Sequence, residues 1–252
     1  MKNFFLIVGV FIVAISTSNS QIITDRPDQT ESSSSVNKGS LQIESGIVLT
    51  FTEDALSSQR QLLAPTTLFR YGILKGLEIR VLNQFESVKD QNSLQTISGI
   101  SDLEVGTKVQ IFKKETVNTE VAFLSHVIFP TGSKALSNDK FGTINKLSIS
   151  HEINDNMSLG YNLGYDYFGE SSGDFTYSVA LGFGVSKTFS IYVEPYGRYL
   201  NFDTYQSSFD AGVTYLLNND CQFDFSFGTG INHTMNYISL GFSIQIAKEN
   251  EL

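Results

Sequence analysis

The sequence predicts an all-β protein, a transmembrane antiparallel up-and-down β-barrel of about 12 strands. The clearest observation is the alternation that runs from Met157 to Ser186 and breaks only at the polar stretch 169–174. Successive side chains of a strand point to opposite faces, and here one face is rich in aromatic residues while the other is small or polar. The outer face of a soluble β-sandwich usually carries Lys, Glu and Thr. A strand that lies between lipid and a crowded polar lumen explains this pattern better.

The second observation is that such segments recur at barrel-like spacing along the chain. An even number of strands is typical of single-chain bacterial barrels. The candidate strands are 40–51, 62–71, 76–86, 102–113, 119–129, 141–151, 157–168, 175–186, 189–200, 205–217, 221–231 and 236–246.

The third observation is that long and short connections alternate for most pairs of strands, as expected for outer loops and periplasmic turns. The exceptions are Lys114–Asn118, which is long for a turn, and the last two outer loops, which are short. The expected outer loops are Thr52–Gln61, Ser87–Ser101, Pro130–Lys140, Gly169–Asp174, Asn201–Thr204 and Asn232–Met235. The expected turns include Gly72–Lys75, Asn154–Asn156, Lys187–Thr188 and Asn218–Asp220. Because the first connection is an outer loop and the number of strands is even, both termini are expected in the periplasm.

The outward-facing side chains are also layered along the predicted strands. Aromatic residues occupy both ends, and aliphatic residues lie between them, as a bilayer selects. The aromatic layers are Tyr165, Tyr167, Phe175, Tyr177, Tyr199 and Tyr205 at the outer end, and Tyr71, Phe189 and Tyr215 at the other.

Two prolines fit the strand pattern poorly. Pro65 and Pro195 each lie within a predicted strand, and each removes one ladder hydrogen bond. A β-bulge, or a position above the bilayer, would accommodate them.

The first 20 residues resemble a secretory signal peptide. Lys2 gives the positive start, Phe4–Ile15 the apolar core and Ser18–Ser20 a small-residue cleavage site. The apolar core is too short for a membrane-spanning helix, which needs about 20 apolar residues. Export together with alternating strands predicts the outer membrane of a Gram-negative bacterium. The expected organisation is a signal peptide (1–20), a periplasmic N-terminal segment (21–39), the barrel (40–247) and a short C-terminal tail (248–252).

Composition narrows the range of partners. The net charge of −9 argues against nucleic acid as a partner. The single cysteine, Cys221, excludes an internal disulfide and a cysteine-based metal cluster. The expected partners are therefore outer-membrane lipid and a small-molecule solute, with no cofactor and no metal.

Strand parity predicts which charged and aromatic side chains point into the lumen. These lumen-lining candidates are Glu44, Arg70, Glu78, Arg80, Glu104, Lys108, Tyr192, Glu194, Tyr196, Arg198, Asp210 and Asp224. They could form a polar conduit, or a salt-bridge network that fills the lumen, because charges at lipid depth must face inward and pair in either case. Tyr192 and Tyr196 could guide an aromatic solute, although cover of the inward Gly182 by Tyr192 is the simpler interpretation.

The stretch 21–39 carries Asp25, Arg26 and Asp28. These charges could let the segment enter the lumen as a plug, but so polar a stretch favours a disordered periplasmic tail.

Two other function classes are weaker. Hydrolysis, as in barrel lipid hydrolases, would need a nucleophile, a base and an orienting group. The three histidines, His126, His151 and His233, fall on different faces or in a loop, and no catalytic motif surrounds them, so we do not expect an enzyme. A closed structural or adhesive barrel, whose outer loops carry the function, remains the alternative to a channel.

Three stretches resemble one bacterial outer-membrane family. They are TDRPDQTES (24–32), GISDLEVGTK (99–108) and FPTGS (129–133). The family is a transporter family named after the meta-cleavage pathway of phenol degradation. The resemblance covers about the first half of the mature chain and implies an outer-membrane barrel that admits small, often hydrophobic or aromatic, compounds.

Overall fold

The structure is a computed structural model that describes residues 21–54, 57–114, 117–169 and 172–246. The predicted signal peptide and C-terminal tail lie outside the described residues. Among those residues, no helix is long and apolar enough to cross a membrane.

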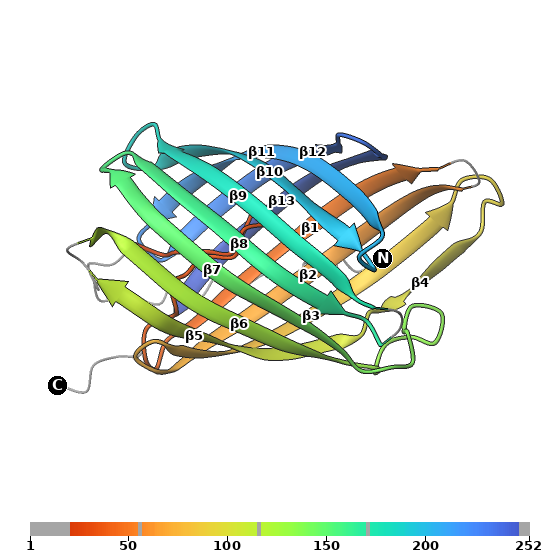
Figure 1. Cartoon of the computed structure of the whole chain (residues 1–252), viewed down its shortest axis with the longest axis horizontal. Coiled ribbons are helices and arrows are strands. Elements are labelled where there is room, and N and C mark those ends of the chain that lie inside the picture. Colours follow the sequence, from red (N-terminus) through yellow and green to blue (C-terminus); the bar gives the residue numbers. More distant parts are fainter. Residues whose placement is uncertain (1–20, 55–56, 115–116, 170–171, 247–252) are drawn as a thin grey trace, which may run out of the picture.

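Thirteen strands are described, and they follow one another around a single sheet (Figure 1). They are β1 (Leu41–Glu53), β2 (Ser58–Leu74), β3 (Leu77–Asp90), β4 (Thr96–Ile100), β5 (Leu103–Lys114), β6 (Thr119–Phe129), β7 (Gly142–Asn154), β8 (Met157–Tyr167), β9 (Asp174–Gly184), β10 (Phe189–Leu200), β11 (Thr204–Asn218), β12 (Cys221–Gly230) and β13 (Thr234–Ile246).

The sheet closes into a barrel of 12 strand positions, which confirms the predicted fold. Each strand pairs antiparallel with its neighbours, and β1 pairs with β13 from Leu41–Ile246 to Glu53–Thr234. β4 and β5 share one position, because β4 pairs with the far end of β3 and β5 with its near end. Among the described strands, closure pairs every strand on both sides except β4, which pairs only with β3 near the end of the barrel. Inside a bilayer an unpaired backbone group would be costly.

The two ends of the barrel differ in their connections. We call the end with connections 54–57, 91–95, 130–141, 168–173, 201–203 and 231–233 the loop end, and the opposite end the turn end. Leu41 and Ile246 pair at the turn end, so the barrel begins and finishes on that side. The predicted loop Ser87–Ser101 is too long: β3 continues to Asp90 and β4 returns beside it, which leaves a connection of residues 91–95.

The barrel is apolar outside and charged inside. Leu163 is 47% exposed and Val179 37%, whereas Arg70, Arg80 and Lys108 are completely buried. The predicted aromatic layers face outward, with Tyr71, Tyr205 and Tyr215 about half exposed. A soluble fold shows the reverse, so this distribution fits a lipid-facing outer surface.

The two prolines are accommodated differently. At Pro65 the register shifts between Leu63 and Thr66, so the β2–β3 ladder contains the expected bulge. Pro195 pairs with Phe209 of β11, and the register to β9 is the same on both sides of it, so no bulge forms there.

An arginine on the outward face should destabilise the barrel. Val179 lies midway along β9 and is exposed on this face, so we expect Val179→Arg to lower the free energy of unfolding by about 2–4 kcal/mol. Reversible urea unfolding in lipid vesicles measures this change. Gln95→Arg, in the exposed connection 91–95, is the control and should change stability little. Equal stability of the two variants would contradict a lipid-facing outer surface.

Candidate functional site

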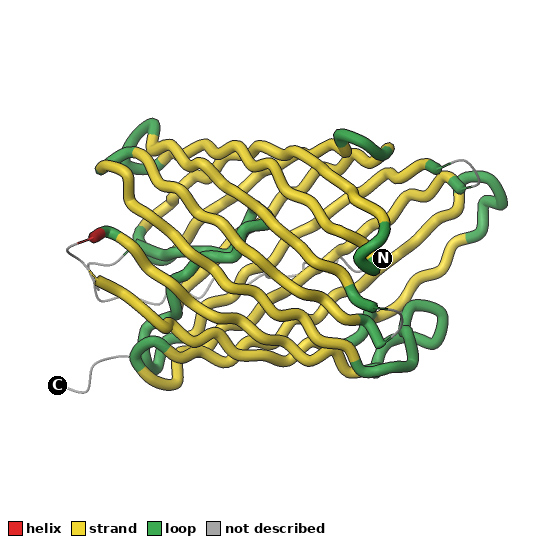
Figure 2. Tube along the Cα trace, in the orientation of Figure 1, coloured by secondary structure: helices red, strands yellow, loops and turns green. Residues whose placement is uncertain are grey.

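Residues 21–40, which we call the lumen segment, run inside the barrel (Figure 2). The segment is not part of a sheet ladder apart from one bridge at Lys38, and wall side chains accept the hydrogen bonds of several of its backbone N–H groups. Asp25 N donates to Glu44 (3.0 Å), Gln29 N to Glu194 (2.7 Å), Glu31 N to Asn162 Oδ1 (2.6 Å) and Val36 N to Glu78 (2.6 Å). Backbone donors out of contact with water need such partners. The expectation of a disordered tail is therefore wrong for this segment.

The lumen segment enters and leaves at the turn end. Ile22 N donates to Asn219 O, in the β11–β12 turn, and Gly39 N donates to Gly72 O near the end of β2. Gly72 permits this contact, because a Cβ there would lie 2.2 Å from the carbonyl oxygen of Asn37. The chain thus folds back on itself within the lumen and presents its middle residues to the centre of the barrel.

The middle of the lumen segment is tied to β1, β2, β3 and β5 by buried ion pairs. We call this group the ion-pair cluster; it comprises Asp25, Glu31, Glu44, Arg70, Glu78, Arg80 and Lys108. Arg70 contacts Glu44 (2.8 Å) and Glu78 (2.9 Å) on the wall. Asp25 accepts from Arg80 (2.5 Å) and Lys108 (2.9 Å).

The lumen segment supplies half of the carboxylates of the cluster. The wall has three cations and two carboxylates, and Asp25 and Glu31 of the segment add two more, so that the carboxylates outnumber the cations by one. Removal of one partner from a buried ion pair leaves an uncompensated charge, which is strongly destabilising. The ion pairs therefore hold the segment against this side of the wall.

His126 extends this network toward the loop end. Arg80 Nε donates to His126 Nε2 (3.0 Å), so the other ring nitrogen, Nδ1, donates to Glu104 (2.9 Å). On the other side of the segment, Arg26 binds Asp224 (3.0 Å) and Ser239 (2.9 Å).

Against β8, β9 and β10 the contacts are hydrogen bonds without ion pairs. Thr30 binds Ser178 (2.7 Å) and Glu194, and Asn162 exchanges hydrogen bonds with the backbone of Glu31. We call this place, where Gln29–Glu31 meet Asn162, Ser178 and Glu194, the crossing. Small residues flank it on the wall, including Gly160, Ala180 and Gly182.

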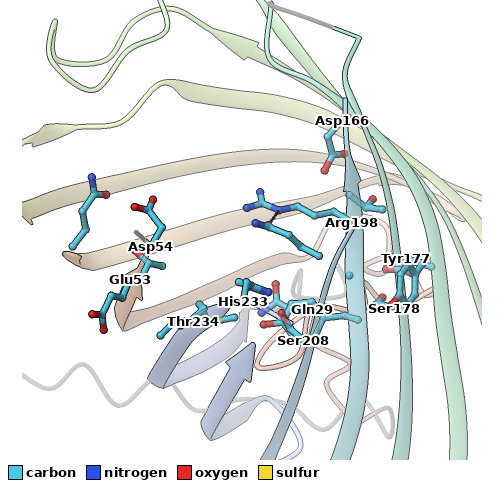
Figure 3. A pocket seen from close by; sticks show the side chains of 18 of the residues that line it. Gln29, Glu53, Asp54, Asp166, Tyr177, Ser178, Arg198, Ser208, His233 and Thr234 are labelled. Carbon is cyan, nitrogen blue, oxygen red and sulfur yellow. Dashed lines mark hydrogen bonds between the residues drawn. The ribbon is translucent and has the colours of Figure 1, made fainter. Parts of the chain in front are cut away.

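The crossing separates two vestibules. The loop-end vestibule, of about 520 Å³, is lined by Gln29, Asp166, Tyr196, Arg198 and His233 among others (Figure 3). The turn-end vestibule, of about 500 Å³, has its own lining residues from β5, β6, β7, β8, β9 and β10, together with Asp28 and Thr30. The neighbouring residues 28, 29 and 30 thus face alternate sides of one partition.

The structure brings the predicted lumen residues into two groups. Glu44, Arg70, Glu78, Arg80 and Lys108 belong to the ion-pair cluster, with Glu104 beside it through His126. Tyr192, Glu194, Tyr196, Arg198 and Asp210 line the other side, and Asp224 holds Arg26. Arg198 is exposed in the loop-end vestibule, where its Nε donates to Gln206 (3.0 Å).

Tyr192 covers a different glycine from the predicted one. It pairs with Gly182 of β9 as expected, but its ring lies over Gly212 of β11, where a Cβ would lie 2.5 Å from the ring. Pairing register alone does not decide toward which neighbouring strand a ring turns.

Sequence reasoning missed Asn162 and Ser178 at the crossing, and Ser239 beside Arg26. These polar residues lie in alternating strands, like many others, and only the path of the lumen segment distinguishes them. The feature of the sequence that could have indicated this path is the charged stretch 24–32, whose side chains need partners inside the barrel.

The histidines lie apart: His126 is in the lumen network, His151 binds Thr119 and Tyr161, and His233 lies by the loop end. Within the described part of the chain, no group of three or more His, Cys, Asp or Glu is arranged to hold a metal ion.

A family model covers residues 24–247, which include the lumen segment from Thr24 onward and all described strands. The chain belongs to the family described as "Putative MetA-pathway of phenol degradation". The match extends through both halves of the barrel, beyond the three stretches that carried the resemblance in the sequence. A search of curated proteins found no match to this chain.

Solved structures with the same fold are outer membrane channels and porins. An outer membrane channel from Pseudomonas putida F1 superposes with a TM-score of 0.69 at 10% identity, covering 92% of this chain and 100% of that chain. The KdgM porin in complex with disordered oligogalacturonate gives 0.56 at 11% identity (81% and 98% covered). The NanC porin gives 0.52 at 12% identity (82% and 100% covered). At these identities the likeness is one of fold.

Loss of the Asp25 carboxylate should destabilise the folded barrel. Asp25→Asn leaves the buried Lys108 with Glu31 at 3.8 Å in place of a carboxylate at 2.9 Å, and we expect it to cost about 3–5 kcal/mol in the free energy of unfolding. Urea unfolding in lipid vesicles measures this cost. Adding Lys108→Met should recover part of it, because the unpaired cation is then gone. Asp203→Asn, in the exposed connection 201–203, is the control, and an Asp25→Asn protein as stable as this control would contradict the role of the ion pairs.

Proposed function

We propose that this protein is a passive channel that admits small molecules through the outer membrane, and that the lumen segment restricts the channel. The observation that carries the proposal is the pair of vestibules at opposite ends of one closed barrel, with the crossing between them. An enzyme or an adhesin would not need two chambers that meet at one partition.

The path runs along β8, β9 and β10. On the opposite side the lumen segment is fixed to β1, β2, β3 and β5 by buried ion pairs, which are costly to break. At the crossing the segment is held by hydrogen bonds, which contribute about 1 kcal/mol net each, or about 1.5–3 kcal/mol for those to the Glu194 carboxylate, and which can exchange with a solute or water. A small displacement of Gln29–Glu31 would therefore connect the two vestibules.

Family membership and fold support this function. The solved structures of the same fold include channels and porins, one of them in complex with oligogalacturonate. The family's description refers to phenol degradation, and two inward-facing tyrosines, Tyr192 and Tyr196, line the vestibules. We infer that the solutes are small and include hydrophobic or aromatic compounds.

The loop end faces the cell exterior and the turn end the periplasm in this proposal. Longer outer loops and shorter periplasmic turns are the rule for outer-membrane barrels. The lumen segment would then enter from the periplasm, and both ends of the barrel domain would lie on that side.

Deletion of the lumen segment should open the channel. In planar bilayers we expect the protein lacking Gln21–Asn37 to conduct several-fold more than the wild type, since the partition is gone. Because the deletion also unbalances the ion-pair cluster, a second variant keeps the whole chain. A disulfide in Thr30→Cys/Ser178→Cys, with Cys221→Ser, should lower conductance, and reduction should restore it.

Matched controls separate opening from unfolding. The cysteine variant under reducing conditions has the same composition as its locked form, and heat-modifiable migration reports that each barrel is folded. A folded deletion protein that stays silent would contradict the channel and favour a closed barrel whose loops carry the function.

A further inference from the structure

Six uncharged polar side chains lie on the outer surface of the wall formed by β1, β2, β3, β5, β6 and β7. Each of them stands in its strand between residues that face the lumen, and successive side chains of a strand point to opposite faces. Ser125, for example, lies between Leu124 and His126, which are buried inside the barrel. We call these six residues the polar patch: Ser45, Thr67, Asn83, Thr107, Ser125 and Asn145.

Three members of the polar patch lie between the two aromatic layers. A row of register partners crosses the sheet from Tyr71, in the layer at the turn end, to Tyr165, in the layer at the loop end. The residues of this row between them are, in order, Ile79, Thr107, Ser125 and Asn145. Because the aromatic layers mark the limits of the apolar band, these side chains lie at lipid depth.

The other three members lie at a similar depth. A second row starts at Tyr215, in the turn-end layer, and passes in order through Phe223, Phe242, Ser45, Thr67 and Asn83. Asn83 lies four residues along β3 from Ile79, the register partner of Tyr71. This separation corresponds to a height of about 10 Å at a strand tilt of about 40°, within an apolar band that is about 25 Å tall.

Two members of the polar patch have no partner. Within the described part of the chain, the side chains of Asn83 and Thr107 make no hydrogen bond, and both residues are exposed. The others are paired: Ser45 and Thr67 share a hydrogen bond (2.8 Å), and Ser125 Oγ donates to Asn145 Oδ1 (2.8 Å). An unpartnered polar group is costly in hydrocarbon, where water cannot replace the missing partner.

The wall on the proposed solute path has no such patch. On the described strands β8, β9 and β10, no Ser, Thr or Asn faces outward, and the outward residues between the aromatic layers include Leu163, Val179 and Ile191. The polar patch therefore distinguishes one side of the barrel, which includes the strands that hold the lumen segment by ion pairs.

A second copy of this chain fits the patch better than lipid or a charged partner. The six side chains carry no charge, and their hydroxyl and amide groups can both donate and accept hydrogen bonds. A surface of this kind is complementary to itself, as the shared face of a two-fold dimer must be. Hydrogen bonds between Ser, Thr and Asn side chains also join neighbouring segments within membranes.

The size of this face approaches that of a stable interface. From β1 to β7 the wall covers five strand spacings, which is about 24 Å, and the apolar band is about 25 Å tall. The face thus offers up to roughly 600 Å² from each copy, compared with about 800 Å² per partner in a standard interface.

We propose that the polar patch is the interface at which two copies of this protein associate in the outer membrane. Asn83 and Thr107 lie on the neighbouring strands β3 and β5, and in the dimer their side chains take hydrogen-bond partners from the second copy. The strands β8, β9 and β10, along which the proposed solute path runs, remain away from the interface. The inference does not depend on that path, because it concerns only the outer surface.

Cysteine cross-linking in phospholipid vesicles tests the contact. Asn83→Cys and Thr107→Cys, each combined with Cys221→Ser, should form disulfide-linked dimers under a mild oxidant, as seen in non-reducing gel electrophoresis. Val179→Cys/Cys221→Ser carries its cysteine on the lipid-facing side of β9 and should remain monomeric. A high lipid-to-protein ratio keeps random collisions from linking this control.

The dimer fraction itself is measured by counting photobleaching steps of labelled protein in the same vesicles. Asn83→Leu/Thr107→Val removes the two unpartnered polar groups and should lower the dimer fraction several-fold. Thr229→Val removes an exposed hydroxyl from β12, outside the patch, and should leave the fraction unchanged.

The outcomes separate the dimer from other occupants and from the proposed function. Folded wild-type protein that is monomeric would overturn the dimer, and so would a dimer fraction that Asn83→Leu/Thr107→Val leaves unchanged. Lipopolysaccharide that is retained by monomeric wild type and lost from this variant would replace the second copy by lipid. If the double variant does not fold, the cross-link decides: no dimer from either cysteine overturns the interface. Silence in planar bilayers would contradict the channel but not the dimer.

Discussion

Two arginines and a lysine buried on adjacent strands are the constraint on which the lumen depends. Arg70, Arg80 and Lys108 are buried inside the barrel, where an unpaired charge is costly. Among the described residues of the wall, Glu44 and Glu78 are the carboxylates that form ion pairs with them. The missing negative charge comes from Asp25 and Glu31, which are not part of any strand. The barrel wall thus requires a polar segment inside it. Residues 21–40 are folded because the wall supplies their backbone hydrogen-bond partners and they supply the wall's counter-charges.

This exchange makes the lumen asymmetric. One side is fixed by a network of ion pairs, in which each group contacts several others. The opposite side, along β8, β9 and β10, has small residues and holds Gln29, Thr30 and Glu31 by hydrogen bonds without ion pairs among the described residues. The filling network among the inward charges is therefore present on the side of β1, β2, β3 and β5. The conduit on the other side is the function that we propose.

The sequence predicted the barrel because strand alternation is local. The period of two fixes which residues of β8, β9 and β10 face lipid, and the observed strand limits lie close to the predicted ones. The same parity indicates that Glu44, Arg70 and Lys108 turn inward, but it contains no information on their partners. Asp25 is separated from Lys108 by more than 80 residues. The polar composition of the segment that carries Asp25 is that of a disordered tail. Only the closed barrel, with its excess of buried cations on one side, explains why the segment enters.

Other differences have similar causes. The sequence pattern assigns β4 to a loop. Its five residues are too few to show a clear alternation, and it pairs with the same strand, β3, as β5 does. The ring of Tyr192 turns toward Gly212 rather than Gly182. Strand parity predicts that the ring faces inward, but not which of the two neighbouring strands it covers. Pro195 needs no bulge, because the register to β9 is maintained across it. Each of these features is decided by contacts between strands that are neighbours in space.

Hydrogen exchange of the lumen segment tests the central claim most directly. The amides of Asp25, Gln29, Glu31 and Val36 donate to buried or half-buried side chains of the wall, so they should exchange slowly in the folded barrel in lipid or detergent. Peptides from residues 21–40 should then show protection comparable with that of the strands, and Asp25→Asn should reduce it. Complete exchange of this segment at the rate of an unstructured chain, in a barrel whose strands are protected, would contradict the account.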